Sequence, residues 1–326
     1  MTAAERFWLR VHRRMTGLQP DMAAALLRSF ALVRESLSPT QLAAFIARGD
    51  VDGVLRLAFG APIFDRAFLP FREQLRRTTE RGFRSTLADL PKAGKIDGAL
   101  AVTFNYLSPD VVTAIRALDT RVLTALKDDV RETVRAFIEN GLRDGRAPRA
   151  VAREIRDLIG LGKTQLQEVQ NFRDALLGKE GRSIQEYTLR NRTVDRLLKK
   201  GPLTAEQVDR YTEAYRKARL TQNAATISRT ATLDSYRLGQ HLSWKAAQEN
   251  GVIPEGYQLM KEWMQLDRPT KRDEHIPLNG EVVPFDQPYS NGSMVPGDDG
   301  SYNCGCLSRV FVARADQVAA LTNGTL

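Results

Sequence analysis

The sequence predicts a mainly α-helical protein that ends in a small α+β unit. Up to about residue 250, apolar residues recur every three or four positions, which is the spacing of one helix face. From Ile253 onward this period gives way to Pro and Gly punctuation and short β-prone runs. Hydrophobic residues make up 42% of the 326 residues and charged residues 27%, which is typical of a packed globular fold.

A helical N-terminal region is expected over residues 1–95. Helical spacing runs from Thr2 to about Gly60, with breaks near residues 37–39 and 49–50, and continues over residues 64–90. The run Pro-Lys-Ala-Gly-Lys at residues 91–95 then interrupts the pattern, so we interpret it as a linker.

A second, basic helical region is expected over residues 96–250. Pro109 is predicted to open a long helix that ends near Gly141, and Pro148 to open another that stops at Gly160. A further helix is predicted over residues 166–176. The sequence Thr-Ala-Glu-Gln at 204–207 is a capping box, which predicts the start of one helix. A second, long helix is expected to follow it and to end at residues 250–251.

Residues 251–326 are expected to form the small α+β unit. The runs 257–263 and 307–312 are β-prone. The dipeptide Asn279-Gly280 is typical of a tight hairpin turn, because both residues tolerate a positive φ. The flanking strands would then be residues 276–278 and 281–283.

The charge distribution indicates a polyanionic neighbour. Lys and Arg outnumber Asp and Glu by 48 to 39, and the central residues 121–220 carry 22 basic against 15 acidic side chains. The densest run supplies five candidate phosphate contacts, Arg190, Arg192, Arg196, Lys199 and Lys200. Such contacts would bind double-stranded DNA without reading its sequence. The alternative, that these charges are solvated helix faces paired with acidic neighbours, stays open.

A histidine and two cysteines in the C-terminal unit suggest a metal site. His275, Cys304 and Cys306, with Asp267 in range, offer the nitrogen, sulfur and oxygen donors of a tetrahedral zinc site. Such an ion would cross-link and stabilise a small unit that has few core residues of its own. The alternative is that the two cysteines merely face the same side of a strand, with His275 hydrogen-bonded to a carboxylate.

We expect no catalytic residues. The run Asp273-Glu274-His275 followed by Asn279 resembles part of an HNH nuclease motif, but a second histidine downstream and the strand–helix context are missing. A metal-dependent DNA-processing enzyme that uses His275 is nevertheless the competing hypothesis. On the helix before this cluster, Arg229 is either a buried clamp for the C-terminal unit or an exposed helix charge.

Several short motifs occur in a fixed order between about residues 225 and 312. They are Ile-Ser-Arg-Thr at 227–230, Trp263, the run 267–275, Leu-Asn-Gly at 278–280, Pro-Gly-Asp at 296–298 and Asn-Cys-Gly-Cys at 303–306. This set resembles the phage head morphogenesis domain of the minor head protein family, the family that includes protein F of phage Mu. Two positions depart from the family pattern, Ala231 in place of a frequent Glu and Gly305 in place of a frequent Arg.

The resemblance implies a minor head (capsid) protein of a tailed bacteriophage, acting in head assembly and in DNA packaging or retention. Its implied partners are the portal protein, the major capsid or scaffolding protein, and non-specifically bound DNA. Its implied location is the virion, inside the head near the portal. Trp263, Asn279 and Gly280 would then be structural residues. The sequence shows no signal peptide and no run of 18 apolar residues, so we expect no membrane contact and a stay in the host cytoplasm during assembly.

Overall fold

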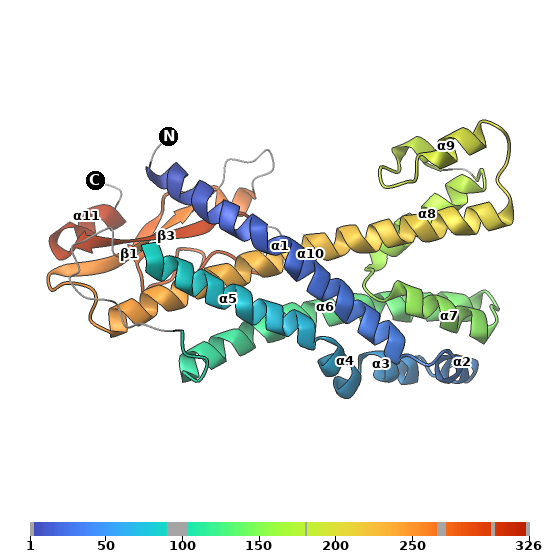
Figure 1. The fold of residues 1–326 in the computed structure, drawn as a ribbon, viewed down its shortest axis with the longest axis horizontal. Coiled ribbons are helices and arrows are strands. Elements are labelled where there is room, and N and C mark those ends of the chain that lie inside the picture. The colour runs from blue at the N-terminus through green and yellow to red at the C-terminus, as the bar shows by residue number, and fades with distance from the viewer. Residues whose placement is uncertain (1–2, 90–103, 180, 266–271, 301–303, 324–326) are drawn as a thin grey trace. The chain divides into compact units, whose positions relative to one another are not determined.

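The computed structural model describes residues 3–89, 104–179, 181–265, 272–300 and 304–323 (Figure 1). It confirms the predicted fold class, because helices dominate the chain and a three-stranded antiparallel sheet lies near its C-terminus. The predicted linker at residues 91–95 falls outside the described residues. No helix in the described ranges is long and apolar enough to cross a membrane.

The chain divides into two compact units, and each unit is assembled from separate stretches of sequence. Unit 1 comprises Met1–Met22, Arg72–Thr120 and Ile227–Leu326, and unit 2 comprises Ala23–Phe71 and Arg121–Thr226. The expected boundaries at residues 95 and 250 therefore do not separate the units. Four long helices run from one unit into the other: α1 (Ala3–Ser36), α5 (Leu69–Asp89), α6 (Pro109–Arg143) and α10 (Ala205–Glu249).

Unit 2 contains most of the shorter helices, and their starts follow the sequence signals. Pro148 occupies the first turn of its helix, and Ser38 and Asp50 cap the backbone N–H groups at the start of theirs. These helices are α2 (Pro39–Ala47), α3 (Val51–Phe59), α4 (Ala61–Ala67), α7 (Pro148–Leu158), α8 (Lys163–Leu176), η2 (Ile184–Glu186) and α9 (Thr193–Leu198).

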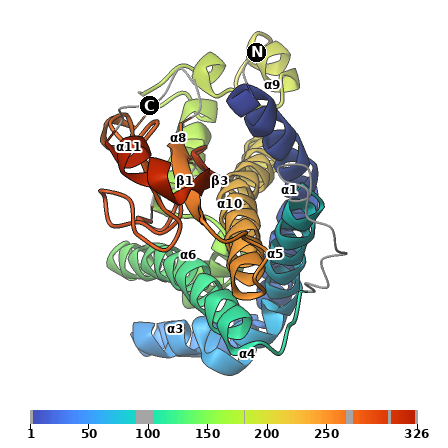
Figure 2. The same ribbon diagram turned by 90° about the vertical axis from the view of Figure 1, so that its left-hand side faces the viewer.

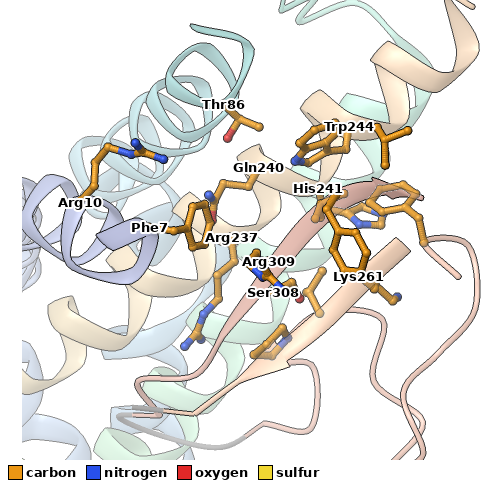
Figure 3. Close-up of a pocket in the computed structure, with 16 residues that line it drawn as sticks. Phe7, Arg10, Thr86, Arg237, Gln240, His241, Trp244, Lys261, Ser308 and Arg309 are labelled. Atoms are coloured by element: carbon orange, nitrogen blue, oxygen red, sulfur yellow. The ribbon is translucent and has the colours of Figure 1, made fainter. Parts of the chain in front are cut away.

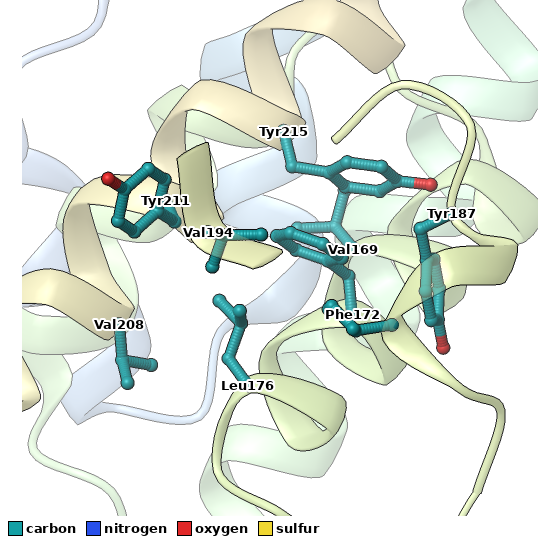
Figure 4. Packing of buried hydrophobic residues seen from close by; sticks show 9 residues of the cluster. Val169, Phe172, Leu176, Tyr187, Val194, Val208, Tyr211 and Tyr215 are labelled. Atoms are coloured by element: carbon teal, nitrogen blue, oxygen red, sulfur yellow. The ribbon is translucent and has the colours of Figure 1, made fainter. Parts of the chain in front are cut away.

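An aromatic cluster holds α8, η2 and α9 against the first turns of α10 (Figure 4). Phe172 stacks on Tyr215 with ring centroids 4.1 Å apart, and Tyr187 meets both rings edge to face. These three side chains are almost fully buried. The segment that carries the basic run 190–200 is thus anchored to a core of its own.

Unit 1 contains the sheet, whose strand order is β2-β1-β3. The strands are β1 (Tyr257–Met264), β2 (Val282–Pro284) and β3 (Leu307–Arg314), and the remaining elements are η3 (Asp273–His275), η4 (Ala315–Gln317) and α11 (Val318–Thr322). The two runs expected as strands at 257–263 and 307–312 are confirmed as β1 and β3, which pair along their whole length.

The predicted hairpin is only half right. Gly280 lies in a turn with φ 88°, and β2 follows it. Residues 276–278, however, continue the turn that follows η3 and form no strand. β2 pairs instead with β1, which lies about twenty residues upstream. The reason is that the turn carries His275 and Leu278 inward, so both side chains are buried.

Helix α10 is one continuous helix where the sequence indicated two. In unit 1 it lies between the sheet and α5 (Figure 2). The close approach to α5 depends on glycine, because a Cβ at Gly239 would lie 2.0 Å from the Thr79 carbonyl oxygen and one at Gly82 would lie 2.4 Å from that of Tyr236. Direct contact between the two backbones therefore determines how closely α10 and α5 pack.

Candidate metal centre

The side chains of His275, Cys304 and Cys306 converge in unit 1. The imidazole Nδ1 lies 3.3 Å from Cys304 Sγ and 3.7 Å from Cys306 Sγ. All three potential ligand atoms lie within 4.8 Å of one another. The exposed fractions are 1% for His275, 6% for Cys304 and 3% for Cys306, so the cluster is sealed from solvent.

These separations fit a zinc ion. Zn–N and Zn–S bonds of about 2.0–2.3 Å in tetrahedral geometry place neighbouring ligand atoms about 3.4–3.8 Å apart. The two N···S distances in the structure are close to that range. Two thiolates and one imidazole are also a donor set that favours zinc over hard cations such as magnesium.

Asp299 fixes the orientation of the histidine ring. Its Oδ2 lies 2.7 Å from His275 Nε2. A carboxylate only accepts hydrogen bonds, so it keeps the proton on Nε2 and leaves the lone pair of Nδ1 facing the sulfurs. This carboxylate–histidine arrangement is common behind metal-binding histidines. The predicted fourth ligand, Asp267, lies outside the described residues.

The two cysteines differ in their protonation. The hydrogen bond from Cys306 lowers the pKa of the Cys304 thiol to about 5, and the positive charge of Arg237 and the Cys306 backbone N–H act in the same direction. The same contact raises the pKa of Cys306, which retains its proton. One thiolate is therefore preformed at neutral pH, and metal binding would have to displace one proton.

Arg237 on α10 clamps the cysteine segment. Its Nη2 donates to the carbonyl oxygens of Cys304 and Cys306, and its Nη1 donates to Asp234 Oδ1 at 3.1 Å. The Arg237 side chain is 3% exposed. The buried arginine is thus found two helical turns after Arg229, which is only partly buried. The sequence-based prediction offered Arg229 as the clamp, but the contacts to the cysteine segment come from Arg237.

A buried shell surrounds the three ligands. Trp263 on β1 meets both His275 and Tyr289 edge to face, and it packs with Leu278 and the two cysteines. Its indole N–H is buried without an acceptor among the residues described. A neighbouring metal-bound thiolate would supply one. Trp263, which we predicted to be a structural residue, is thus buried beside the candidate ligands.

The loop between β2 and β3 is fastened by Lys261, which the sequence analysis did not single out. Its Nζ donates to the Met294 carbonyl oxygen at 2.8 Å and lies 4.8 Å from the centre of the Tyr289 ring. Burial lowers the pKa of Lys261 to about 8. A charged residue in the middle of a strand gave no sequence signal for this inward position.

Asn279, Gly280 and Gly297 each close a turn beside the cluster. Asn279 Oδ1 accepts a hydrogen bond from the Gln265 backbone N–H at 2.7 Å, and Gly280 donates to the Trp263 carbonyl oxygen. Gly297 adopts φ 101°, and a Cβ there would lie 2.7 Å from Asp234 Oδ1. The Pro-Gly-Asp motif therefore lies against the ion pair that holds the cysteine segment.

The basic run in unit 2 contains one arginine that is held by contacts within the protein and four residues that are exposed. Arg190 pairs with both carboxylate oxygens of Asp195 at 2.8 Å and donates to two backbone carbonyls, so it is a structural residue. This bidentate pairing also lowers the pKa of Asp195. The other four predicted contacts are exposed: Arg192, Arg196, Lys199 and Lys200.

Comparison with known proteins gives no match for this chain, whether with protein-family profiles, with curated proteins or with solved structures.

Proposed function

We propose that this protein is a structural component of a tailed-bacteriophage head, of the minor head type, whose C-terminal unit is closed by zinc. The observation that carries the proposal is the convergence of scattered motifs on one buried site. Trp263, the segment 278–280, Gly297 and the cysteine pair all contribute to the same cluster or its supports. Motifs that occurred in this order by chance would not be expected to meet at one buried site.

The burial of the cluster favours a structural ion over a catalytic one. A catalytic zinc keeps a position open to water and substrate, whereas a structural zinc is enclosed by protein. His275 is 1% exposed, one of its nitrogens faces Asp299 and the other faces the sulfurs. A histidine held in this way is poorly placed to activate water against a DNA strand, so the nuclease alternative gains no support.

Zinc would compensate for the thin core of the small unit. Three short elements meet at the cluster, namely η3, the cysteine segment and β1, and among the described residues a small apolar group around Trp263 holds them together. When bound, the ion would link η3 to the start of β3 through His275 and the two cysteines. The binding free energy would then contribute directly to folding.

The exposed basic residues near α9 support a DNA-facing role. Arg192, Arg196, Lys199 and Lys200 project from a segment that is fixed by the aromatic core around Phe172 and by the Arg190–Asp195 pair. A rigid group of cations binds phosphates at a lower entropic cost than a floppy one. We therefore assign to this surface the non-specific retention of packaged DNA.

Elemental analysis tests the metal. Protein purified after zinc-replete expression should contain about one equivalent of zinc. The Cys304→Ser and Cys306→Ser variants should lose it, whereas Ser308→Ala, next to the cluster, should retain it. A zinc-free wild type under these conditions would contradict the structural-ion proposal.

Association with the portal protein tests the assembly role. The chain should co-purify with the portal protein of the same phage when the two are co-expressed. Plasmid DNA incubated with the chain and Mg²⁺, Mn²⁺ or Zn²⁺ should remain uncut. Cleavage that His275→Ala abolishes would instead establish the enzyme hypothesis.

Salt dependence tests the DNA contact. Affinity for duplex DNA should fall steeply as salt rises, and replacing the four exposed cations by Gln should reduce the slope of log K against log salt by about 3–4. The same number of substitutions at exposed Arg6, Arg13, Arg28 and Arg48 is the control. An equal effect of both sets would show that the α9 surface has no special role.

A further inference from the structure

A cavity of about 410 Å³ in unit 1 borders β3 (Figure 3). Its wall is formed by α1, α5, α10, the sheet and the loop before β3. Aromatic side chains from four of these segments contribute to it: Phe7, Trp244, Phe285 and Phe311. The volume lies within the range of about 300–1,000 Å³ that is common for ligand sites. The metal cluster does not line this cavity.

Five successive residues of β3, Ser308 to Val312, line the cavity. Consecutive side chains of a strand point to opposite faces of the sheet. A cavity that touches five in a row borders the backbone of the strand as well as its side chains. Lys261 on β1 and Phe285 after β2 also line it, so the cavity reaches across the sheet to β3. One edge of β3 is occupied by β1, and the other is its outer edge.

The backbone groups on that outer edge can be identified from the pairing on the far side of β1. Trp263 exchanges backbone hydrogen bonds with Gly280 and Glu281, so its N–H and C=O point toward β2. The next residue, Glu262, therefore points its own groups toward β3, where it faces Arg309.

By the same alternation, Met260 bonds to Phe311, its register partner. The alternate residues Ser308, Val310 and Val312 therefore direct their N–H and C=O groups to the outer edge of β3, away from β1. In the described part of the chain no other strand pairs with them. Val310 and Val312 are also only partly buried. An edge of this kind is a template for a further strand.

The charged side chains of the cavity wall indicate which kind of ligand the edge would bind. The cavity wall carries four cationic side chains, Arg10, Arg237, Lys261 and Arg309, and none of its described lining residues is acidic. Arg237 and Arg309 have carboxylate partners in Asp234 and Glu262. Lys261 instead is held by a carbonyl oxygen and an aromatic ring, and no salt bridge from the described residues neutralises its charge.

We infer that the outer edge of β3 binds an extended, acidic segment of a partner protein by strand addition. Backbone hydrogen bonds to Ser308, Val310 and Val312 would supply affinity, alternate apolar side chains would enter the aromatic cavity, and acidic side chains would face its cations. The site contains none of the three candidate zinc ligands and none of the residues of the DNA-facing surface, although Arg237 borders both the cavity and the cysteine segment.

Peptide binding to the full-length protein tests the inference. The probe is a fluorescein-labelled peptide of about eight residues that alternates Val and Glu. A peptide with Lys in place of Glu should bind at least about tenfold more weakly, because it reverses the charge match. The acidic peptide with alternate backbone N-methyl groups should also lose at least about tenfold, because it cannot complete a ladder.

Variants of β3 locate the site. Val310→Pro removes an outward N–H that the β1 ladder does not use, and it should abolish peptide binding. Val310→Thr retains that N–H and should bind within about twofold of the wild type. Circular dichroism establishes that both variants are folded, and the N-methyl series gives the same answer if Val310→Pro is not.

Charge variants of α1 provide the second readout. Arg10→Gln should weaken binding of the acidic peptide, whereas Arg13→Gln, on the same helix but outside the cavity, should not. Equal binding of the N-methylated peptide, equal binding of the Lys peptide, or no binding at all would overturn the proposal. Full displacement by free glutarate would also overturn it, because the site would then be a pocket for small anions.

Discussion

His275 Nε2 lies 2.7 Å from Asp299 Oδ2, and this contact turns the opposite nitrogen of the ring toward two cysteine sulfurs. The two residues come from η3 and from the loop before the cysteines, 24 positions apart. The carboxylate therefore acts through the histidine, as a positioning group for the candidate metal ligands.

Replacing Asp299 by Asn should weaken zinc binding without removing a ligand. An amide can satisfy Nε2–H but does not raise the basicity of the ring as a carboxylate does, so the affinity should fall about 10–100-fold. Competition with a chromogenic chelator measures it. The control is Asp286→Asn, an exposed change in the loop after β2. An unchanged affinity in Asp299→Asn would show that this carboxylate plays no part in metal binding.

Replacing Arg237 by Met should destabilise the protein by about 3–5 kcal/mol, because it leaves Asp234 and two buried carbonyl oxygens without their donor. Arg229→Met, on the same helix, should cost no more than about 0.5 kcal/mol. Denaturant unfolding of the two variants measures the free energies. Similar losses in both would mean that Arg237 is not the clamp described here.

Replacing Gly239 by Ala should destabilise the contact between α10 and α5. The added Cβ would lie 2.0 Å from the Thr79 carbonyl oxygen, a backbone atom that cannot rotate away. A loss of at least about 1–3 kcal/mol is expected. Gly17→Ala is the opposite case, because nothing lies within 4 Å of its added Cβ. That exposed helical change should stabilise by about 0.5–1 kcal/mol in the same unfolding measurement.

Stability should depend on pH through His241, which stacks on Phe285. Burial, followed by the charge of Lys261, lowers the pKa of this imidazole from 6.5 to about 4. Between these values the unfolded histidine is protonated and the native one is neutral. Stability contributed by His241 is therefore complete above pH 6.5 and is lost as the pH falls to about 4, by up to about 3 kcal/mol.

The variant His241→Phe isolates this effect. It retains an aromatic ring against Phe285 but cannot titrate, so its unfolding free energy should fall by about 3 kcal/mol less over the same pH interval. All other titrating groups are shared with the wild type and cancel in the comparison. Parallel pH profiles for the two proteins would rule out a buried, neutral His241.

The sequence by itself determined the helical body, both long strands and the identity of three candidate ligands. These follow from local physics. Apolar spacing, Pro109 and Pro148 at helix starts, and the β-prone runs all act within a few residues. Cys304, Cys306 and His275 stood out because these residue types are rare in the chain and chemically suited to zinc.

Only the tertiary structure decided how those parts are joined. The two units share four helices, so no linear boundary could describe them. β2 pairs with β1 because burial of His275 and Leu278 outweighs the local hairpin signal of Asn279-Gly280. Arg237, and not the predicted Arg229, forms the clamp, because its guanidinium reaches the cysteine carbonyls from α10. Periodicity shows that a helix has a buried face, but the partner across that face belongs to a distant part of the chain.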